Sequence, residues 1–153
     1  MELTQLVSEK FIISELRGET KEDVLKEMMN LLAQKGIDAE ASLSAIMERE
    51  ALGSTGVGEQ VAIPHAKVSD IEDVAVAVAV KREGIEFSAA DGIPVKLLFM
   101  LVSPDKQMNR HLKTLARISK LVKLTDFKER ILAESLSASD IYAILQQEES
   151  RLE

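Results

Sequence analysis

The chain has 153 residues, of which 46% are apolar and 29% are charged, and this size and composition predict one soluble globular domain over residues 1–153. Its 19 basic and 26 acidic residues give a formal charge of −7, which argues against a surface that coats nucleic acid or anionic lipid. The absence of cysteine excludes disulfides, thiolate metal sites and cysteine nucleophiles. Residues 1–9 are acidic and the longest apolar run, residues 74–80, is short, so we expect a cytoplasmic protein without membrane insertion.

Two helices are predicted in the first third of the chain. Thr20, with Asp23 three residues later, forms a variant of the capping box, and the helical spacing of apolar residues that follows ends at Gly36. Asp38 begins a second helix, which carries Arg49 in its last turn. The apolar side of this second helix holds Leu43, Ile46 and Met47.

An irregular segment follows the second helix. The glycines Gly53, Gly56 and Gly58 lie close together in the chain and indicate a loop. Residues 61–64 then have the pattern of a short strand or extended piece that ends at His65. The sequence therefore places His65 beside a glycine-rich loop.

Two longer stretches have the pattern of buried strands. Residues 74–80 alternate valine and alanine, so β-branched side chains lie on one face and alanines on the other. Because both faces are apolar, this strand is predicted to be central, and a helix can approach its alanine face closely. Residues 95–102 form a second buried strand after a turn at residues 91–94. Buried strands among helices predict a layered α/β domain.

The last third of the chain is predicted to be helical. Residues 109–123 form an amphipathic helix, Thr125 begins a short helix that ends at Leu132, and Ser137 or Ser139 begins a final one. The tail is polar and acidic. One side of the first of these helices is expected to hold Leu112, Leu115, Ser119 and Val122. No repeat or linker interrupts the chain, so one site is expected to carry the chemistry.

The two histidines, His65 and His111, are the candidate nucleophiles, because an imidazole offers a neutral nitrogen near neutral pH. A helix end and a glycine loop precede His65, an order that lets Arg49 and loop amides surround one ring, as a phosphoryl group on nitrogen requires. Plainer alternatives remain. In the plainer interpretation, His65 is a hydrogen-bonded loop residue with no catalytic role, and Arg49 is an exposed cation that offsets the helix dipole.

His111 lies at the start of a predicted helix, where the plainer interpretation is a partly buried, hydrogen-bonded side chain. The surrounding residues 105–123 are strongly basic. Such a stretch is usually a solvated face. The functional alternative is an aid to holding phosphate or a docking surface for an acidic partner, which would include Arg117 and Lys120.

Other kinds of site find little support. The two histidines lie far apart in the chain, with no carboxylate at helical spacing, so neither a metal nor another cofactor is expected. The glycines lack the Gly-Lys-Ser/Thr ending of a nucleotide-binding loop. A hydrolase that uses Ser54 with His65 is disfavoured because no Gly-x-Ser-x-Gly elbow surrounds that serine.

Residues 50–66 read Glu50-x6-Val57-Gly58-x2-Val61-Ala62-Ile63-Pro64-His65-Ala66. This run resembles the phosphorylation-site signature of the enzyme IIA domains of the fructose/mannitol class (type 2) in the bacterial phosphoenolpyruvate-dependent sugar phosphotransferase system. Every fixed position matches, and a motif of this length with a Pro-His core is specific. The likeness extends to residues 53–56, 94–99 and 111–115.

The resemblance implies a phosphocarrier with a phosphohistidine intermediate. His65 would accept a phosphoryl group from the small histidine-containing phosphocarrier protein and pass it to a cysteine of an enzyme IIB. That cysteine must lie on another chain, because this one has none. The family's arginine and its second histidine fall on Arg49 and His111. The family fold is a mixed β-sheet flanked by helices, consistent with the layered α/β prediction.

Physical chemistry assigns roles to these residues. A phosphoryl group in flight spreads its charge over three oxygens, so the protein mainly positions the reacting nitrogens and neutralises charge. Arg49 can donate two parallel hydrogen bonds, and His111 can orient the ring of His65 or bind phosphoryl oxygens. Further phosphoryl-binding donors are expected from the loop amides of Ser54, Thr55, Gly56, Val57 and Gly58.

Two functions fit this resemblance. The first is a phosphotransferase component of sugar uptake that works with separate IIB and IIC proteins. The second is a nitrogen-related regulatory IIA protein, whose phosphorylation state controls binding to protein partners. Both use the same histidine. The lack of a fused IIB or IIC segment suits the regulatory branch and is compatible with sugar uptake.

Overall fold

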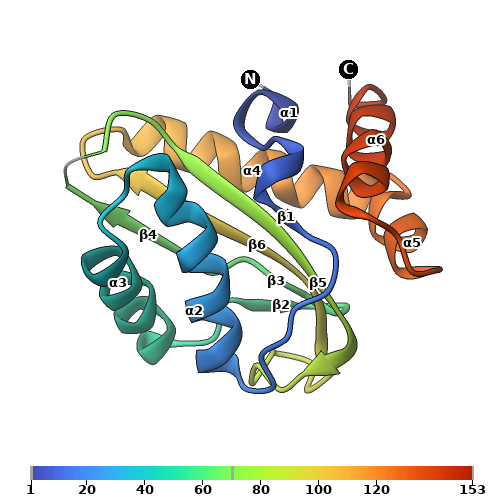
Figure 1. The fold of residues 1–153 in the computed structure, drawn as a ribbon, viewed down its shortest axis with the longest axis horizontal. Coiled ribbons are helices and arrows are strands. Elements are labelled where there is room, and N and C mark those ends of the chain that lie inside the picture. Colours follow the sequence, from blue (N-terminus) through green and yellow to red (C-terminus); the bar gives the residue numbers. More distant parts are fainter. Residues whose placement is uncertain (1, 70, 153) are drawn as a thin grey trace.

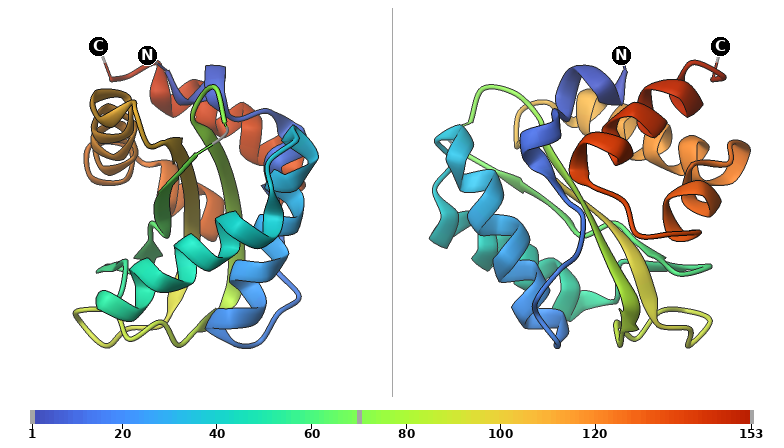
Figure 2. Two further views of the ribbon diagram at one scale, coloured as in Figure 1. Left: turned by 90° about the vertical axis from the view of Figure 1, so that its left-hand side faces the viewer. Right: turned by 45° about the vertical axis from the view of Figure 1, so that its right-hand side comes forward.

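The sheet is mixed and has helices on both faces (Figures 1 and 2). The computed structural model describes residues 2–69 and 71–152. Its strands run in the order β1-β5-β6-β3-β2, and β4 also pairs with β6. The strands are β1 (Ile12–Ile13), β2 (Gly56–Gly58), β3 (Val61–Ala62), β4 (His65–Val68), β5 (Ala75–Ile85) and β6 (Val95–Pro104). The predicted α/β class with a mixed sheet flanked by helices is confirmed.

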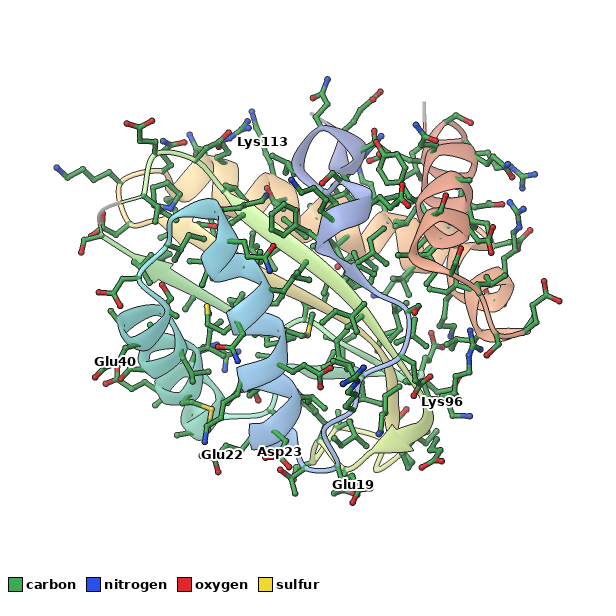
Figure 3. The ribbon with its side chains drawn as sticks, in the orientation of Figure 1. Glu19, Glu22, Asp23, Glu40, Lys96 and Lys113 are labelled. Carbon is green, nitrogen blue, oxygen red and sulfur yellow. The ribbon has the colours of Figure 1, made fainter. Side chains whose placement is uncertain are left out.

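Helices α2 and α3 cover one face of the sheet, and α1, α4, α5 and α6 cover the other. Their bounds are α1 Leu3–Leu6, α2 Lys21–Leu32, α3 Ala39–Leu52, α4 Met108–Leu124, α5 Phe127–Leu132 and α6 Ala138–Glu149. Short 3-10 turns occupy Glu9–Phe11 and Ala33–Lys35. Charged side chains such as Glu40 and Lys113 project away from the body (Figure 3). No helix within the described ranges is long and apolar enough to span a bilayer.

The helix starts follow the predicted capping residues. Thr20, Asp38 and Ser137 each accept a hydrogen bond from the backbone N–H three residues further on. Of the two serines considered for α6, Ser137 is therefore the cap. Thr125 lies one residue before the N-cap of α5, yet its hydroxyl oxygen still accepts the N–H two residues on, at 3.1 Å. Local hydrogen bonding thus sets these boundaries.

Strand β5 lies between β1 and β6, and over residues 75–81 it is buried on both faces, as predicted for the valine–alanine run. Its valines, which include Val76 and Val78, join the core beneath α4, α5 and α6. Its alanines, which include Ala77 and Ala79, join the core that α2 and α3 cover. The short alanine side chains let α2 lie close to the sheet.

Strand β6 organises the irregular segment before it in the chain. It pairs antiparallel with β5, and parallel with both β3 and β4, where His65 lies opposite Leu101. Two predictions therefore need correction. The glycine loop contains a short strand, β2, which pairs with β3, and His65 begins strand β4 instead of ending the extended piece. The backbone groups of these residues find partners in distant strands, which local patterns cannot show.

The face of α4 that meets the sheet differs from the prediction. The expected apolar side included Leu112, which is 54% exposed. The buried residues are His111, Thr114, Ile118 and Leu121. Two of these four are polar, and each has a partner: Ser103 Oγ lies 2.7 Å from His111 Nδ1, and Thr114 Oγ1 donates to a backbone carbonyl at 2.8 Å. Hydrogen bonding allows polar residues to occupy this face.

The acidic end of α6 is buried instead of solvated. Glu149 is 3% exposed and accepts hydrogen bonds from the N–H groups of Leu3 and Thr4, at 2.6 and 3.0 Å. Arg117 pairs with the same carboxylate at 2.9 Å, so this arginine is not a free cation of the basic stretch. One carboxylate thus ties α1, α4 and α6 together.

We expect Glu149→Ala to lower the free energy of unfolding by about 3 kcal/mol, because it leaves the Arg117 charge and two amides without their partner. Urea unfolding measures this loss. Gln147→Ala, at an exposed position of the same helix, is the control and should change stability little. Equal effects of the two substitutions would show that the carboxylate does not hold these elements together.

Candidate active site

A cavity of about 480 Å³ lies between α3, β4 and α4, and three of the predicted site residues line it. Arg49 comes from the last turn of α3, His65 from the first position of β4, and His111 from the first turn of α4. These residues are distant in sequence. The sheet and its flanking helices bring them together.

His65 is half-buried, and its Nδ1 lies 2.7 Å from the carbonyl oxygen of Ile63. A carbonyl oxygen can only accept a hydrogen bond, so Nδ1 must carry the hydrogen. In the neutral ring the lone pair then lies on Nε2. The carbonyl of Pro64 accepts the N–H of Leu101 on β6 at 2.9 Å, which holds this turn in place. The local backbone therefore decides which nitrogen can act as a nucleophile.

His111 is 4% exposed, and its ring centroid lies 5.5 Å from that of His65, with the planes tilted by 56°. Burial, together with the nearby charges of His65 and Lys67, lowers the pKa of His111 to about 4, and burial is the largest of these causes. The ring is therefore neutral at pH 7. A neutral ring carries a single N–H, which can serve as a hydrogen-bond donor.

Arg49 is half-buried, and its Nη1 donates a hydrogen bond to the carbonyl of Gly53 at 2.7 Å. Within the described residues, no carboxylate forms an ion pair with its guanidinium. Its bond to the residue that ends α3 fits the plainer interpretation of a helix-end cation. The same position on the cavity wall also leaves a positive charge beside His65.

The structure does not bring residues 54–58 into the lining of the cavity. The N–H of Thr55 donates to Glu50 at 3.2 Å, and the N–H of Gly56 donates to Ser54 Oγ at 3.0 Å. Val57 and Gly58 instead line a different hollow, beside α5. The phosphoryl-binding role expected for the amides of Ser54, Thr55, Gly56, Val57 and Gly58 stays a prediction.

Glu50 explains why this loop is held as it is. Its carboxylate is buried, pairs with Lys21 on α2 at 2.6 Å and accepts hydrogen bonds from both the hydroxyl and the N–H of Thr55. The acidic residue that opens the signature motif thus fastens the loop to α2 and α3. This role is structural.

Sequence reasoning missed two polar residues of the site. Lys67 also lines the cavity, two residues after His65 on β4. The sequence could have indicated Lys67, because alternate residues of a strand share a face and Lys67 lies two residues after His65. Ser103 contacts His111 from β6, across the connection between β6 and α4, and no sequence pattern indicated this contact, because it depends on how α4 packs against the sheet. Exposed apolar side chains at the cavity are Leu52, Met108 and Leu112.

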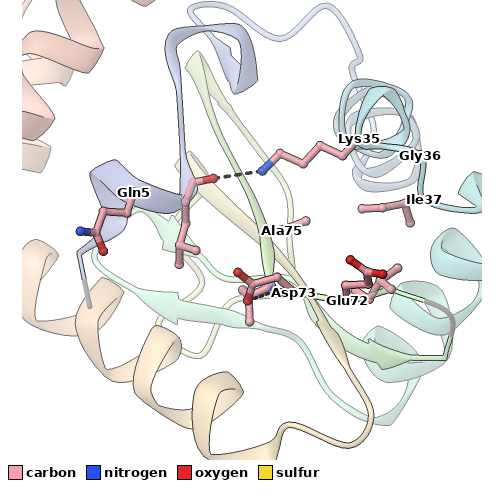
Figure 4. Close-up of a pocket in the computed structure, with 10 residues that line it drawn as sticks. Gln5, Lys35, Gly36, Ile37, Glu72, Asp73 and Ala75 are labelled. Carbon is pink, nitrogen blue, oxygen red and sulfur yellow. Dashed lines mark hydrogen bonds between the residues drawn. The ribbon is translucent and has the colours of Figure 1, made fainter.

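A second cavity, of about 530 Å³, lies near α1 and contains none of the predicted site residues (Figure 4). The ammonium of Lys35 donates to the carbonyl of Leu6 at 3.0 Å, and burial lowers its pKa. Asp73, also on the wall, forms a two-pronged bond with Arg110. Lys35 and Asp73 therefore each already have a hydrogen-bond partner. Across the described ranges, no group of three or more acidic or histidine side chains is arranged to hold a metal.

Comparison with known proteins gives one family match. The family described as "Phosphoenolpyruvate-dependent sugar phosphotransferase system, EIIA 2" matches residues 5–148. A nitrogen regulatory protein of Bradyrhizobium diazoefficiens is 36% identical over 146 residues, which cover 95% of each chain. The fructose-specific EIIABC component of Bacillus subtilis is 35% identical over 141 residues, or 90% of this chain. The match covers only 22% of that longer protein.

Solved structures include a similar fold. The nitrogen regulatory protein IIA-Ntr from Neisseria meningitidis matches with a TM-score of 0.85 at 28% identity. The match covers 94% of this chain and 98% of that one. The likeness therefore extends over nearly the whole described chain.

The low pKa of His111 makes stability depend on pH. Between about pH 6.5 and about pH 4 the unfolded chain binds a proton on this ring and the folded chain does not, so acidification favours unfolding. We expect the free energy of unfolding to fall more for the wild type than for His111→Gln between pH 7 and pH 5. Urea unfolding at both values measures this. Equal decreases would contradict burial of a neutral ring.

Proposed function

We propose that this chain, which belongs to the EIIA 2 family of the phosphoenolpyruvate-dependent sugar phosphotransferase system, carries a phosphoryl group on Nε2 of His65. One observation supports the assignment of the atom: the bond from Nδ1–H to the carbonyl of Ile63 leaves the lone pair on Nε2. The ring also lines an open cavity, beside the cations Arg49 and Lys67. A nucleophile needs this access, and an anionic cargo needs these charges.

The transfer consists of one bond exchange. The donor is the phosphohistidine of a small histidine-containing phosphocarrier protein. Nε2 of His65 attacks phosphorus while the phosphorus–nitrogen bond of the donor breaks, and the electron pair returns to the donor ring. The new bond places positive charge on the ring of His65. The carbonyl of Ile63, which already accepts its Nδ1–H, stabilises that charge.

Three further residues of the cavity interact with the three equatorial oxygens of the phosphoryl group during transfer. Arg49 and Lys67 neutralise their negative charge, and His111 donates a hydrogen bond without adding a charge of its own. The exposed apolar residues Leu52 and Leu112 at the cavity are suited to contact with a partner protein that excludes water. Low local polarity strengthens the interactions of the phosphoryl group.

Two destinations for the phosphoryl group remain, each with its own support. In sugar uptake it moves to a cysteine of a separate enzyme IIB, and similarity to a fructose-specific EIIABC component favours this route. In regulation the phosphorylation state of His65 controls binding to protein partners. Similarity over 95% of a nitrogen regulatory protein favours this second route.

We expect His65→Ala to take up no label from the radiolabelled phosphocarrier protein, because the nucleophile is gone. His111→Ala should still be labelled, but about 10² to 10³ times more slowly, because it removes a hydrogen-bond donor and keeps the nucleophile. Rapid-quench labelling with unfolding controls measures both. Equal labelling of the two variants would refute the assignment of His65.

The two destinations are separated by following the label from loaded protein. Under the sugar-uptake route, we expect it to move to a purified fructose-type IIB domain, and a IIB variant without its cysteine should not be labelled. Under the regulatory route, label stays on this chain, and pull-downs from the phosphorylated and unphosphorylated forms differ in a kinase, sensor or channel partner. Rapid loss of label to IIB would argue against a purely regulatory role.

A further inference from the structure

Ser103 lies in the buried strand β6, and its side chain is fully inaccessible to solvent. Its Oγ lies 2.7 Å from Nδ1 of His111. No other described residue forms a hydrogen bond with this hydroxyl. One hydrogen must therefore lie between the two atoms, and either the serine or the histidine can supply it.

Burial decides between the two arrangements. If His111 Nδ1 carried the hydrogen, the hydroxyl hydrogen of Ser103 would point at no acceptor among the described residues, at a position that bulk solvent does not reach. If Ser103 donates, its hydrogen is bonded, and only oxygen lone pairs lack a partner. An unpaired buried donor costs more than an unpaired lone pair. The hydroxyl of Ser103 is therefore the donor, and Nδ1 is the acceptor.

We propose that Ser103 is a positioning residue, which holds His111 in the tautomer whose hydrogen is on Nε2, so that His111 presents an N–H to a phosphoryl group on His65. This role rests on the proposed function of His65. The tautomer itself follows from the hydrogen bond and the burial alone.

The two rings then have opposite hydrogen-bonding characters. His65 donates through Nδ1 and offers a lone pair at Nε2. His111 accepts at Nδ1 and offers an N–H at Nε2, in the cavity that both rings line. An N–H attracts phosphoryl oxygens, whereas a lone pair in its place would repel them.

The pairing of β4 with β6 fixes where Ser103 lies relative to His65. In the register of β4 and β6, His65 lies opposite Leu101 and Lys67 lies opposite Ser103. The serine that orients His111 is therefore two residues along β6 from the partner of His65. A shift of register by one residue would turn Ser103 to the other face of the sheet.

The tautomer can be read from long-range ¹H–¹⁵N NMR spectra of the unphosphorylated protein at neutral pH. We expect His111 of the wild type to show its pyrrole-type nitrogen at Nε2. In Ser103→Ala, the two tautomers should mix, whereas Ser103→Thr, which keeps a hydroxyl, should resemble the wild type. Ser119→Ala, a serine-to-alanine change elsewhere on α4, is the matched control and should leave the spectrum unchanged.

Labelling from the phosphocarrier protein supplies the second readout. We expect Ser103→Ala to slow phosphoryl uptake about tenfold. This is less than the effect of His111→Ala, because the His111 ring is still present and carries its hydrogen on Nε2 for part of the time. Ser119→Ala should be labelled at the wild-type rate. Thermal unfolding separates a loss of fold from a loss of orientation.

The outcomes are distinct. A wild-type His111 with its hydrogen on Nδ1 overturns the assignment to Ser103, whether or not any mutant folds. An unchanged tautomer and rate in Ser103→Ala also overturns it. If wild-type His65 takes up no label while the spectrum shows hydrogen on Nε2, then the proposed function fails and the tautomer assignment stands.

Discussion

The parallel pairing of β4 with β6 is the constraint on which the site depends. Strand β6 is buried along its length and pairs with three other strands, one antiparallel and two parallel. This pairing fixes the position of His65 along the sheet, opposite Leu101, and places Ser103 two residues further along the neighbouring strand. Helix α4 then packs over the same strands and brings in His111. The geometry of the two rings is therefore a property of strand register, which a buried sheet specifies strongly.

The site combines one strong anchor with several weaker ones. The carbonyl of Ile63 contacts Nδ1 of His65 and so leaves Nε2 as the free nitrogen, and because this contact lies within three residues, it is built into the local chain. Arg49, in the last turn of α3, provides a positive charge, and His111, in the first turn of α4, provides a neutral hydrogen-bond donor. In the proposed phosphoryl transfer, a cation and a neutral hydrogen-bond donor share the binding of the anionic phosphoryl group. Keeping His111 neutral avoids a further buried charge beside the cavity.

Buried polar groups outside the site serve as connectors. Glu50 joins α2, α3 and the glycine loop through Lys21 and Thr55. Glu149 joins α1, α4 and α6. Because it pairs with Arg117, that arginine does not contribute a free charge to the basic surface expected for α4. In both cases one carboxylate satisfies several donors at once, which is the arrangement that makes burial of a charge tolerable. The net charge of the sequence does not reveal these pairs.

The sequence by itself determined most of the helices and long strands, and it singled out His65 as the candidate nucleophile. Capping residues set the helix starts at Thr20 and Asp38, and the valine–alanine alternation set the central strand, because both signals act over a few residues. The signature around His65 gave the family. Only the tertiary structure decided the buried face of α4, the strand that His65 begins and the pairing of Arg117. Each of these depends on contacts with another element of the fold, and local periodicity carries no information about which residue of that element makes the contact.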